Sequence, residues 1–295
     1  MKNNYICPIC EAKLTELDEI YFKCESCGLN IKKELKSDEI TNDHLDYQEI
    51  IKKDGLTKFK MKLVKSLDPK RIGLLDIGTA SGKFLHHARN EFVNVQGIEV
   101  NQACITFAQE KLQLKLVPSL SEIDFSQVSC VTFWHSLEHI PLELSRKILD
   151  DLKKLPVDAK LVISVPNSKS WQFKIFKHLW PYYDKSSHLY QFSPDALNLF
   201  MKSNGYKLRL KKIGLMYELF GYLQGFVNLI HPIPNYFYYR KKRGWDFHLT
   251  ETKLLAYDIY NYLLLIIFMP ISMLACLFSL FKNEGVINYI YERDL

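Results

Sequence analysis

Residues 74–85, LLDIGTASGKFL, are the stretch that most constrains the fold, because an apolar run ends there in an acid and a loop of small residues. The apolar run over 72–77 predicts a short buried strand, and helical spacing resumes over 83–90. Glycines at positions 78 and 82 lie between them, so the segment predicts a strand, a loop and a helix. An ordinary strand-to-helix turn often has one glycine, whereas a small-residue loop here is typical of a nucleotide-type site in an α/β protein.

This loop matches neither of two common phosphate-binding patterns. A P-loop would need glycine in place of Ile77 and Ser or Thr in place of Phe84. A dinucleotide fingerprint that begins at Gly78 would need glycine in place of Ala80 and Lys83. An acid before the loop would repel a pyrophosphate but attract an ammonium group, so the sequence favours a cationic ligand.

A second acid, Glu99, ends the apolar run over 93–99, VNVQGIE, and stands 23 residues after Asp76. An acid at the tip of the second strand of a doubly wound sheet can accept hydrogen bonds from both hydroxyl groups of a ribose. Alone, it could equally be a solvated acid at a strand end. Together, the two acids and the loop predict a site for a nucleoside that carries a positive group and no phosphate.

These residues resemble motif I and the acidic second-strand motif of class I S-adenosylmethionine-dependent methyltransferases. The resemblance implies that the loop approaches the methionine part of the cofactor and that Glu99 binds its ribose. Position 80 usually holds glycine in that family. The resemblance assigns the cofactor to Asp76, Gly78, Thr79, Ala80, Gly82 and Glu99.

The same resemblance extends over roughly residues 45–215 and the last ten. The segment 130–141 resembles the fourth strand and its Leu-Glu-His exit, and 161–167 resembles the fifth strand. The resemblance also implies a seventh, antiparallel strand over 286–292, between strands five and six. The expected fold is therefore α/β, a doubly wound seven-stranded methyltransferase sheet. The nearest relatives by these motifs are the ubiquinone-type O-methyltransferases and those encoded with bacterial surface-polysaccharide enzymes.

Four of the seven cysteines form two Cys-x-x-Cys pairs, thirteen residues apart: Cys7, Cys10, Cys24 and Cys27. Two such turns can close a tetrahedral four-thiolate site, so we expect a zinc ribbon. A redox Cys-x-x-Cys would need a βαβ setting that this segment lacks. A strand is expected at 19–23, and Gly28 is expected to have positive φ. All four ligands come from the protein, so the Zn²⁺ is expected to be structural.

Two histidines, His139 and His188, are the candidate catalytic bases, because an imidazole can take a proton from a hydroxyl acceptor near neutral pH. For each, bracing a loop is an equally good interpretation. Glu138 and His139, with His135 one helical turn earlier, could instead hold a divalent cation. His135 replaces an acid that some ubiquinone-type relatives use there, so we do not count this group among the metal sites.

The C-terminal third is apolar and aromatic. Residues 259–281 contain no charge, a length that could span a bilayer, but Pro270 in the middle would kink a helix. A seventh strand of the same sheet after this run also requires the chain to return to the side of the membrane from which it left. We expect a re-entrant or interfacial helical pair at the membrane surface; a true span, or a lid or dimer surface, is the alternative. The basic cluster 240–243 (RKKR) and five aromatic residues would lie at the headgroups: Tyr236, Phe237, Tyr238, Tyr239 and Trp245.

The predicted organisation has five segments. They are a zinc-ribbon module (1–32), a linker with lead-in helices (33–70), the methyltransferase domain (71–215), an apolar helical insertion (216–283) and a final strand (284–295). The lead-in helices are expected from the helical spacing of apolar residues between positions 56 and 67. With 47% hydrophobic residues among 295, the chain can fill a sizeable core.

The expected function is O-methylation, with S-adenosylmethionine as cofactor, of an amphiphilic or lipid-linked acceptor such as an envelope polysaccharide precursor. Alternatives are a quinone or isoprenoid acceptor, and a non-catalytic scaffold with the same fold. The net charge of +6 is too diffuse to favour nucleic acid. No signal-peptide-like run opens the sequence, so we expect a cytoplasmic protein, peripheral to the inner face of the membrane; a homodimer stays open.

Overall fold

The computed structural model describes residues 5–34, 45–242, 247–279 and 283–294. The chain forms two compact units. The first contains residues 1–168, 185–212 and 287–295, and the second contains 169–184 and 213–286. The expected apolar insertion therefore lies in the second unit, together with a short segment that precedes it in sequence.

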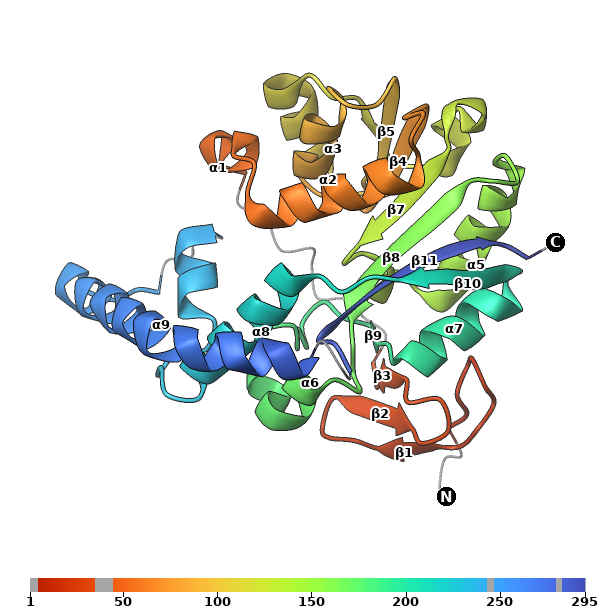
Figure 1. The fold of residues 1–295 in the computed structure, drawn as a ribbon. Helices are drawn as coiled ribbons and strands as arrows, with labels where there is room; N and C mark the ends of the chain where they lie inside the picture. Colours follow the sequence, from red (N-terminus) through yellow and green to blue (C-terminus); the bar gives the residue numbers. More distant parts are fainter. Residues whose placement is uncertain (1–4, 35–44, 243–246, 280–282, 295) are drawn as a thin grey trace. The chain divides into compact units, whose positions relative to one another are not determined.

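A seven-stranded sheet forms the centre of the first unit, in the order β10-β11-β8-β7-β4-β5-β6 (Figure 1). Its strands are β4 (Gly73–Ile77), β5 (Asn94–Ile98), β6 (Leu116–Val117), β7 (Cys130–Trp134), β8 (Lys160–Pro166), β10 (Tyr206–Lys211) and β11 (Val286–Arg293). The five strands from β4 to β8 pair in parallel, and β11 pairs antiparallel with β10. The predicted place of the last strand, between the fifth and the sixth, is confirmed.

Helices cover both faces of this sheet, as a doubly wound fold requires (Figure 1). They are α1 (Tyr47–Ile51), α2 (Gly55–Leu67), α3 (Lys83–Ala88), α4 (Gln102–Phe107), α5 (Leu142–Asp151) and α7 (Pro194–Ser203). Short helical turns are η1 (Ala108–Leu112), η2 (Leu120–Glu122), η3 (Phe125–Gln127), η4 (Leu137–His139) and η5 (Leu152–Lys154).

Alternate residues of the central strands fill two separate cores, because successive side chains of a strand point to opposite faces. One core packs against α5 and α7 and contains Leu75, Val131 and Ile163. The other packs against α2 and α3 and contains Leu74, Cys130 and Val162. Strands buried on both faces read as continuous apolar runs, which is why the sequence predicted them.

The cysteine segment joins a second sheet in the same unit, ordered β1-β2-β3-β9. Its strands are β1 (Leu14–Glu16), β2 (Tyr21–Cys24), β3 (Asn30–Lys32) and β9 (Tyr190–Gln191). Ile31 pairs with Tyr190, and Asn30 pairs with Gln191. The side-chain amide of Asn30 also donates a hydrogen bond to Oε1 of Gln191 at 3.0 Å. The sequence predicted β2 but not β9, which is too short to show a periodic pattern.

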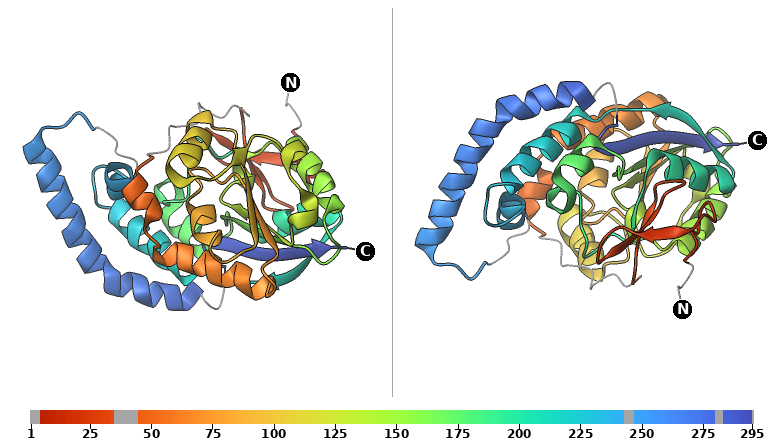
Figure 2. Two further views of the ribbon diagram at one scale, coloured as in Figure 1. Left: turned by 90° about the horizontal axis from the view of Figure 1, so that it is seen from above. Right: turned by 90° about the horizontal axis from the view of Figure 1, so that it is seen from below.

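The second unit is helical, with α6 (Trp171–Phe176), α8 (Leu215–Asn228), α9 (Glu251–Ser279) and the short turns η6 (Lys177–Leu179) and η7 (Tyr238–Lys242). Helices α8 and α9 pack against each other. Helix α9 continues through Pro270, and its ribbon is curved (Figure 2). It is long and apolar enough to cross a membrane by length and composition, with a mean hydropathy of 2.3 over its most apolar 18 residues. Arg243 and Trp245, singled out in the sequence, lie outside the described residues.

Candidate functional site

The acids and histidines predicted to bind cofactor or act as bases gather at the carboxyl edge of the parallel strands. Strand β4 has β5 on one side and β7 on the other, so the order of the strands reverses at β4. Such a switch point leaves a crevice beyond the strand ends, where open α/β sheets bind their ligands. The loop 78–82 follows β4, Glu99 follows β5, and the segment 135–139 follows β7.

The loop after β4 depends on left-handed backbone conformations. Gly78, Ala80 and Gly82 have φ values of +73°, +50° and +79°. A Cβ atom on Gly78 would lie 2.5 Å from the Cβ atom of Ser136, so only glycine fits there. Ala80 has the same left-handed backbone but carries a methyl group, which strains it. This explains in physical terms why glycine suits position 80.

Glu99 ties this loop to the end of β5. Its carboxylate accepts hydrogen bonds from the backbone N–H groups of Ala80 at 2.7 Å, Val100 at 2.8 Å and Asn101 at 2.9 Å. A carboxylate can accept about four hydrogen bonds, so one further donor, such as a ribose hydroxyl group, can be accommodated. The side chain is 8% exposed, which holds the acceptor in one orientation.

Asp76, like the other acids of the site, is buried, with 2% of its surface exposed. Its carboxylate accepts a hydrogen bond of 2.5 Å from the hydroxyl group of Thr132 on β7. Burial raises the pKa of Asp76, while Thr132 and the positive charge of Lys60 oppose that rise. A buried carboxylate with unused acceptor capacity fits the ammonium group of an amino acid.

Lys60, on α2, is a site residue that the sequence did not predict. Its ammonium group lies 5.0 Å from the centre of the Trp134 ring and 5.9 Å from that of Phe84. Burial lowers its pKa to about 8, although the charge of Asp76 acts in the other direction. A signal was present: Lys60 is one turn from Thr57 and Val64, which are buried, so it lies on the inner face of α2.

The two predicted bases, His139 and His188, lie close to a third residue, Glu138 in η4, which has no exposed surface. Its Oε1 atom lies 3.5 Å from Nδ1 of His135 and 3.9 Å from Nε2 of His188. The rings of His139 and His188 pack edge to face, with their centres 4.7 Å apart. Burial acts to raise the pKa of Glu138, but the surrounding imidazoles outweigh it and the pKa is lowered. Glu138 is therefore an anion that can stabilise a protonated imidazole.

The orientation of His139 follows from its backbone partner. Its Nδ1 atom lies 3.0 Å from the carbonyl oxygen of Ser187. A carbonyl oxygen only accepts, so Nδ1 carries the proton and Nε2 of the neutral ring has the free electron pair. The next residue but one on that segment, Leu189, donates its N–H to the carbonyl oxygen of Glu138 at 3.0 Å. His139 is thereby arranged to accept a proton at Nε2.

The same residues satisfy the geometry of a cation site. Ligand atoms of Glu138, His139 and His188 all lie within 4.8 Å of one another. The sequence had weighed His135 with Glu138 and His139; the fold instead brings in His188, from 49 residues further along the chain. Two imidazoles and one carboxylate suit a transition metal better than magnesium, which prefers oxygen ligands.

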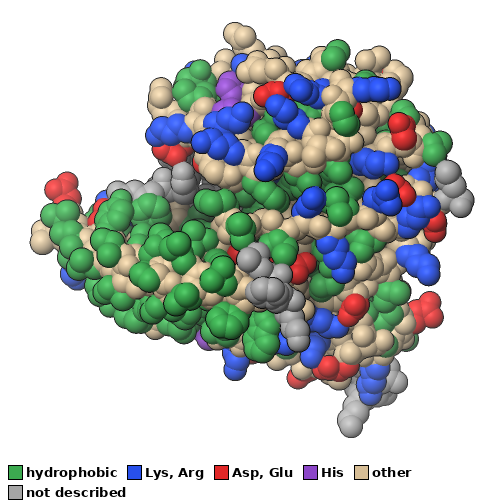
Figure 3. Space-filling view, viewed as in Figure 1, with side chains coloured by type: hydrophobic (Ala, Val, Ile, Leu, Met, Phe, Trp, Pro, Cys, Tyr) green, Lys and Arg blue, Asp and Glu red, His purple; other side chains and the backbone are tan. Residues whose placement is uncertain are grey.

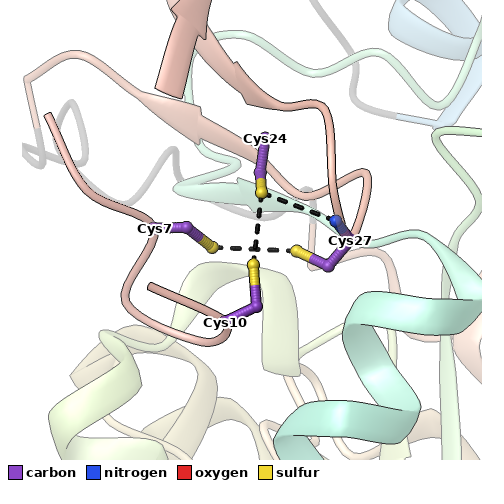
Figure 4. A group of neighbouring side chains, drawn as sticks. All are labelled: Cys7, Cys10, Cys24 and Cys27. Carbon is purple, nitrogen blue, oxygen red and sulfur yellow. Dashed lines mark hydrogen bonds between the residues drawn. The ribbon is translucent and has the colours of Figure 1, made fainter. Parts of the chain in front are cut away.

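The four cysteines of the N-terminal segment converge on one point (Figure 4). The Sγ atoms of Cys7 and Cys27 are 3.7 Å apart, and those of Cys10 and Cys24 are 3.3 Å apart. A tetrahedral zinc ion with bonds of about 2.3 Å needs ligand sulfurs roughly 3.8 Å apart. The donor set fits zinc, and a hydrogen bond from Cys27 lowers the pKa of Cys7 to about 5. Gly28 has φ of +78°, as predicted.

The cysteine segment contacts the chain next to His188. The hydroxyl group of Tyr21 donates to the carbonyl oxygen of His188 at 3.1 Å, and the N–H of Lys32 donates to that of Leu189 at 2.9 Å. The hydroxyl group of Ser193 donates to the carbonyl oxygen of Cys27. These hydrogen bonds connect the cysteine segment to the backbone around His188, one of the two candidate bases.

A family profile described as a methyltransferase domain matches residues 47–211, more than half of the chain. The comparison with curated proteins found no match.

Several solved structures are similar to this chain at low sequence identity. An S-adenosylmethionine-dependent methyltransferase from Archaeoglobus fulgidus is 16% identical, with a TM-score of 0.45 over 84% of this chain and 100% of that one. A magnesium protoporphyrin IX methyltransferase from Synechocystis PCC 6803 is 18% identical, with a TM-score of 0.42 over 56% and 80%. An amino pentose methyltransferase from Micromonospora echinaspora is 20% identical, with a TM-score of 0.32 over 37% and 48%. This chain thus spans less than half of that last protein.

Proposed function

We propose that this chain, which belongs to the methyltransferase domain family, uses S-adenosylmethionine to methylate an oxygen atom of an amphiphilic or lipid-linked acceptor. The acceptor that we favour is a sugar of an envelope polysaccharide precursor. The observation that carries the proposal is the placement of the Asp76–Glu99 pair and of the His139–Glu138 pair at one edge of the sheet.

S-adenosylmethionine, when bound, supplies a methyl group on a positively charged sulfur. In our proposal Asp76 accepts hydrogen bonds from the ammonium group of the methionine part, and Lys60 faces its carboxylate. Glu99 accepts a hydrogen bond from one ribose hydroxyl group at its remaining acceptor site, and the loop 78–82 leaves room for the backbone to approach. These assignments are supported by the burial of Asp76 and by the three backbone donors that hold Glu99.

Methyl transfer is an in-line displacement, so most of the catalytic effect comes from holding the two reactants at near-attack distance. His139 is proposed to take the proton from the acceptor hydroxyl group at Nε2 as the new O–CH₃ bond forms and the S–CH₃ bond breaks. Glu138 and His188 are proposed to stabilise the resulting imidazolium, since a buried carboxylate lies beside the imidazole pair. The other product is the demethylated cofactor.

We further propose that the four cysteines hold one structural zinc ion. All four ligands would come from the protein, which leaves no open coordination position for catalysis. Cysteines that bind zinc and form no disulfides are typical of a reducing compartment, so a cytoplasmic location, on the inner face of the membrane, is the location that we propose.

Two other functions are alternatives: methylation of a different acceptor, and a scaffold role without activity. A quinone-like or other isoprenoid acceptor is favoured by the apolar second unit as much as a lipid-linked sugar is. A scaffold without activity would be favoured by loss of the site acids; both Asp76 and Glu99 are present, and among the cofactor-binding residues Ala80 is the one departure from the family pattern.

The acceptor is tested by incubating purified protein with methyl-labelled S-adenosylmethionine and a bacterial membrane lipid extract. We expect label in the organic phase that mild acid, which cleaves glycosyl–phosphate–prenyl linkages, moves to the aqueous phase. Label that stays in the organic phase after acid would support the quinone or isoprenoid acceptor. Protein that binds the cofactor but transfers no label to the extract would contradict a lipid acceptor. His139→Gln is the matched variant, with lost transfer and retained cofactor binding expected.

A further inference from the structure

Helix α9 is built the opposite way from a helix of a water-soluble protein. Its buried residues are mostly small or polar, whereas large aliphatic and aromatic residues occupy its outer surface. The buried set is Asn261, Leu264, Ser272, Cys276 and Ser279. Only 22% of its most apolar 18-residue window is buried within the structure. Apolar side chains cover the visible surface of α9 (Figure 3).

From this inverted arrangement we infer that the α8–α9 pair lies in the surface of a lipid bilayer, with the outer face of α9 in the acyl region. Helix pairs in membranes meet through small and polar residues, because lipid rather than a protein core surrounds their large apolar side chains. Ser279 on α9 follows this rule, since its hydroxyl group donates to that of Tyr222 on α8 at 2.9 Å. The inference is independent of the cofactor site and of the acceptor proposed above.

The width of the apolar face favours lipid over a second copy of the chain. Successive residues of a helix are rotated by about 100° around its axis. Viewed down the axis of α9, the exposed apolar side chains form one continuous arc of roughly 200°, with Met269 at one edge and Ile271 at the other. This face includes Ile259, Leu263, Ile266, Ile267, Met273, Leu274, Leu277 and Phe278, each at least 52% exposed. One protein partner covers a stripe of roughly 100°, whereas lipid surrounds a helix on every free side.

The charges of α9 gather near its N-terminal end, next to several aromatic rings, as at a membrane interface. Among the described residues of α9, the charged ones stand between Glu251 and Asp258, and residues 259–279 carry none. Asp258 accepts from Nε of Arg240 at 3.3 Å and from the hydroxyl group of Tyr236 at 2.9 Å. Because the outer face of α9 over residues 259–279 is apolar and uncharged, apolar burial is expected to contribute more than attraction to anionic lipid to holding the protein on the bilayer.

Chain connectivity favours an interfacial position over a crossing. Strand β11 begins at Val286 and lies beside β10 in the sheet, so the chain must return to its starting side. The seven steps from Ser279 to Val286 reach at most about 25 Å, less than the roughly 30 Å of the hydrocarbon core. Helix α8, with 14 residues and a length of about 21 Å, is also too short to cross. Both helices therefore lie along one leaflet.

Vesicle flotation of the full-length protein tests this inference. We use vesicles of phosphatidylcholine alone and of phosphatidylcholine mixed with phosphatidylglycerol. Wild-type protein is expected to float with both, and high salt is expected to change little. The double variant Ile266→Gln/Phe278→Gln alters two of the most exposed residues of α9, so it is expected to fold, while its partition falls by more than about tenfold. Val93→Gln, at an 85% exposed site of the first unit, is the matched control.

Each other outcome is informative. Wild-type protein that stays at the bottom with both vesicles overturns the inference, as does a double variant that floats like wild type. A wild-type dimer in detergent-free solution, separated by the double variant and indifferent to vesicles, would assign the face to a second copy instead. Cofactor binding, measured on every variant, reports on the first unit and keeps failure of the proposed function separate from failure of this inference.

Discussion

The hydroxyl group of Tyr21 donates a hydrogen bond to the backbone carbonyl oxygen of His188 at 3.1 Å, across 167 residues of sequence. Tyr21 is fully buried and begins the strand that leads to Cys24. Since β3 also pairs with β9, which begins two residues after His188, the cysteine module supports the segment that brings His188 to Glu138. The module therefore contributes to the geometry of the candidate base as well as to folding.

Removing that hydroxyl group tests the connection. Tyr21→Phe is expected to lower kcat roughly threefold to tenfold, because the loss of one buried hydrogen bond costs about 1 kcal/mol and loosens His188. Affinity for S-adenosylmethionine is expected to stay unchanged, since that site lies on other strands. Tyr47→Phe, at a tyrosine that is 41% exposed, serves as control. Equal kcat for Tyr21→Phe and wild type would show that the contact does not position the base.

The cysteines give a second prediction. Cys24→Ser is expected to reduce bound zinc from about one ion per chain to well under one, and to unfold the module, which is too small to fold without its metal. Methyl transfer should fall with it, because β3 then no longer supports β9. Metal analysis and a transfer assay check this, with Cys104→Ala, a buried cysteine outside the cluster, as control. Wild-type protein with negligible zinc would contradict the assignment.

Position 80 gives a prediction on stability. Ala80→Gly is expected to raise the free energy of unfolding by about 1 kcal/mol, because glycine adopts φ near +50° without the strain that a Cβ atom causes. The reverse change, Gly82→Ala at φ of +79°, is expected to lower it by a similar amount or more. Chemical denaturation measures both. A destabilised Ala80→Gly variant would show that the methyl group makes packing contacts that outweigh the strain.

Lys60 is expected to make the affinity for S-adenosylmethionine depend on pH. Its pKa of about 8 means that the ammonium form prevails below pH 8 and is lost above it. Affinity for S-adenosylmethionine should therefore weaken as the pH rises through 8, and Lys60→Met should weaken it by about tenfold at neutral pH.

The amino group of the ligand itself titrates in the same range, so the contribution of the lysine is the difference between wild type and Lys60→Arg, which keeps its charge. Calorimetric titrations at several pH values measure that difference. Identical pH profiles for wild type and Lys60→Arg would exclude Lys60 from the carboxylate site.

The sequence predicted the parts of the site that directly follow a recognisable buried strand. Asp76 and Glu99 stand at strand ends because continuous apolar runs mark the buried strands before them. It did not predict that His188 reaches Glu138, because the contact depends on the pairing of β3 with the two-residue strand β9. Lys60 was missed because a lysine in an amphipathic helix usually faces solvent.

The apolar character of 259–281 was visible, but the direction of its faces was not. Composition reveals a run without charge, whereas the packing of α8 against α9 decides that Asn261 and Ser272 point inward. A kink was expected at Pro270; the helix continues through that residue to Ser279, and its ribbon is curved (Figure 2). An inward polar stripe is visible only when the partner helix is known.

The most direct test of the central claim is calorimetric titration of S-adenosylmethionine into wild-type protein and into Asp76→Asn and Glu99→Gln. Both substitutions keep the shape of the side chain while removing its charge. We predict binding by wild type and by the exposed control Asp150→Asn, and affinities lower by about tenfold to a hundredfold in the two site variants. Well-folded wild-type protein that binds neither S-adenosylmethionine nor its demethylated product, or site variants that bind as tightly as wild type, would contradict the account.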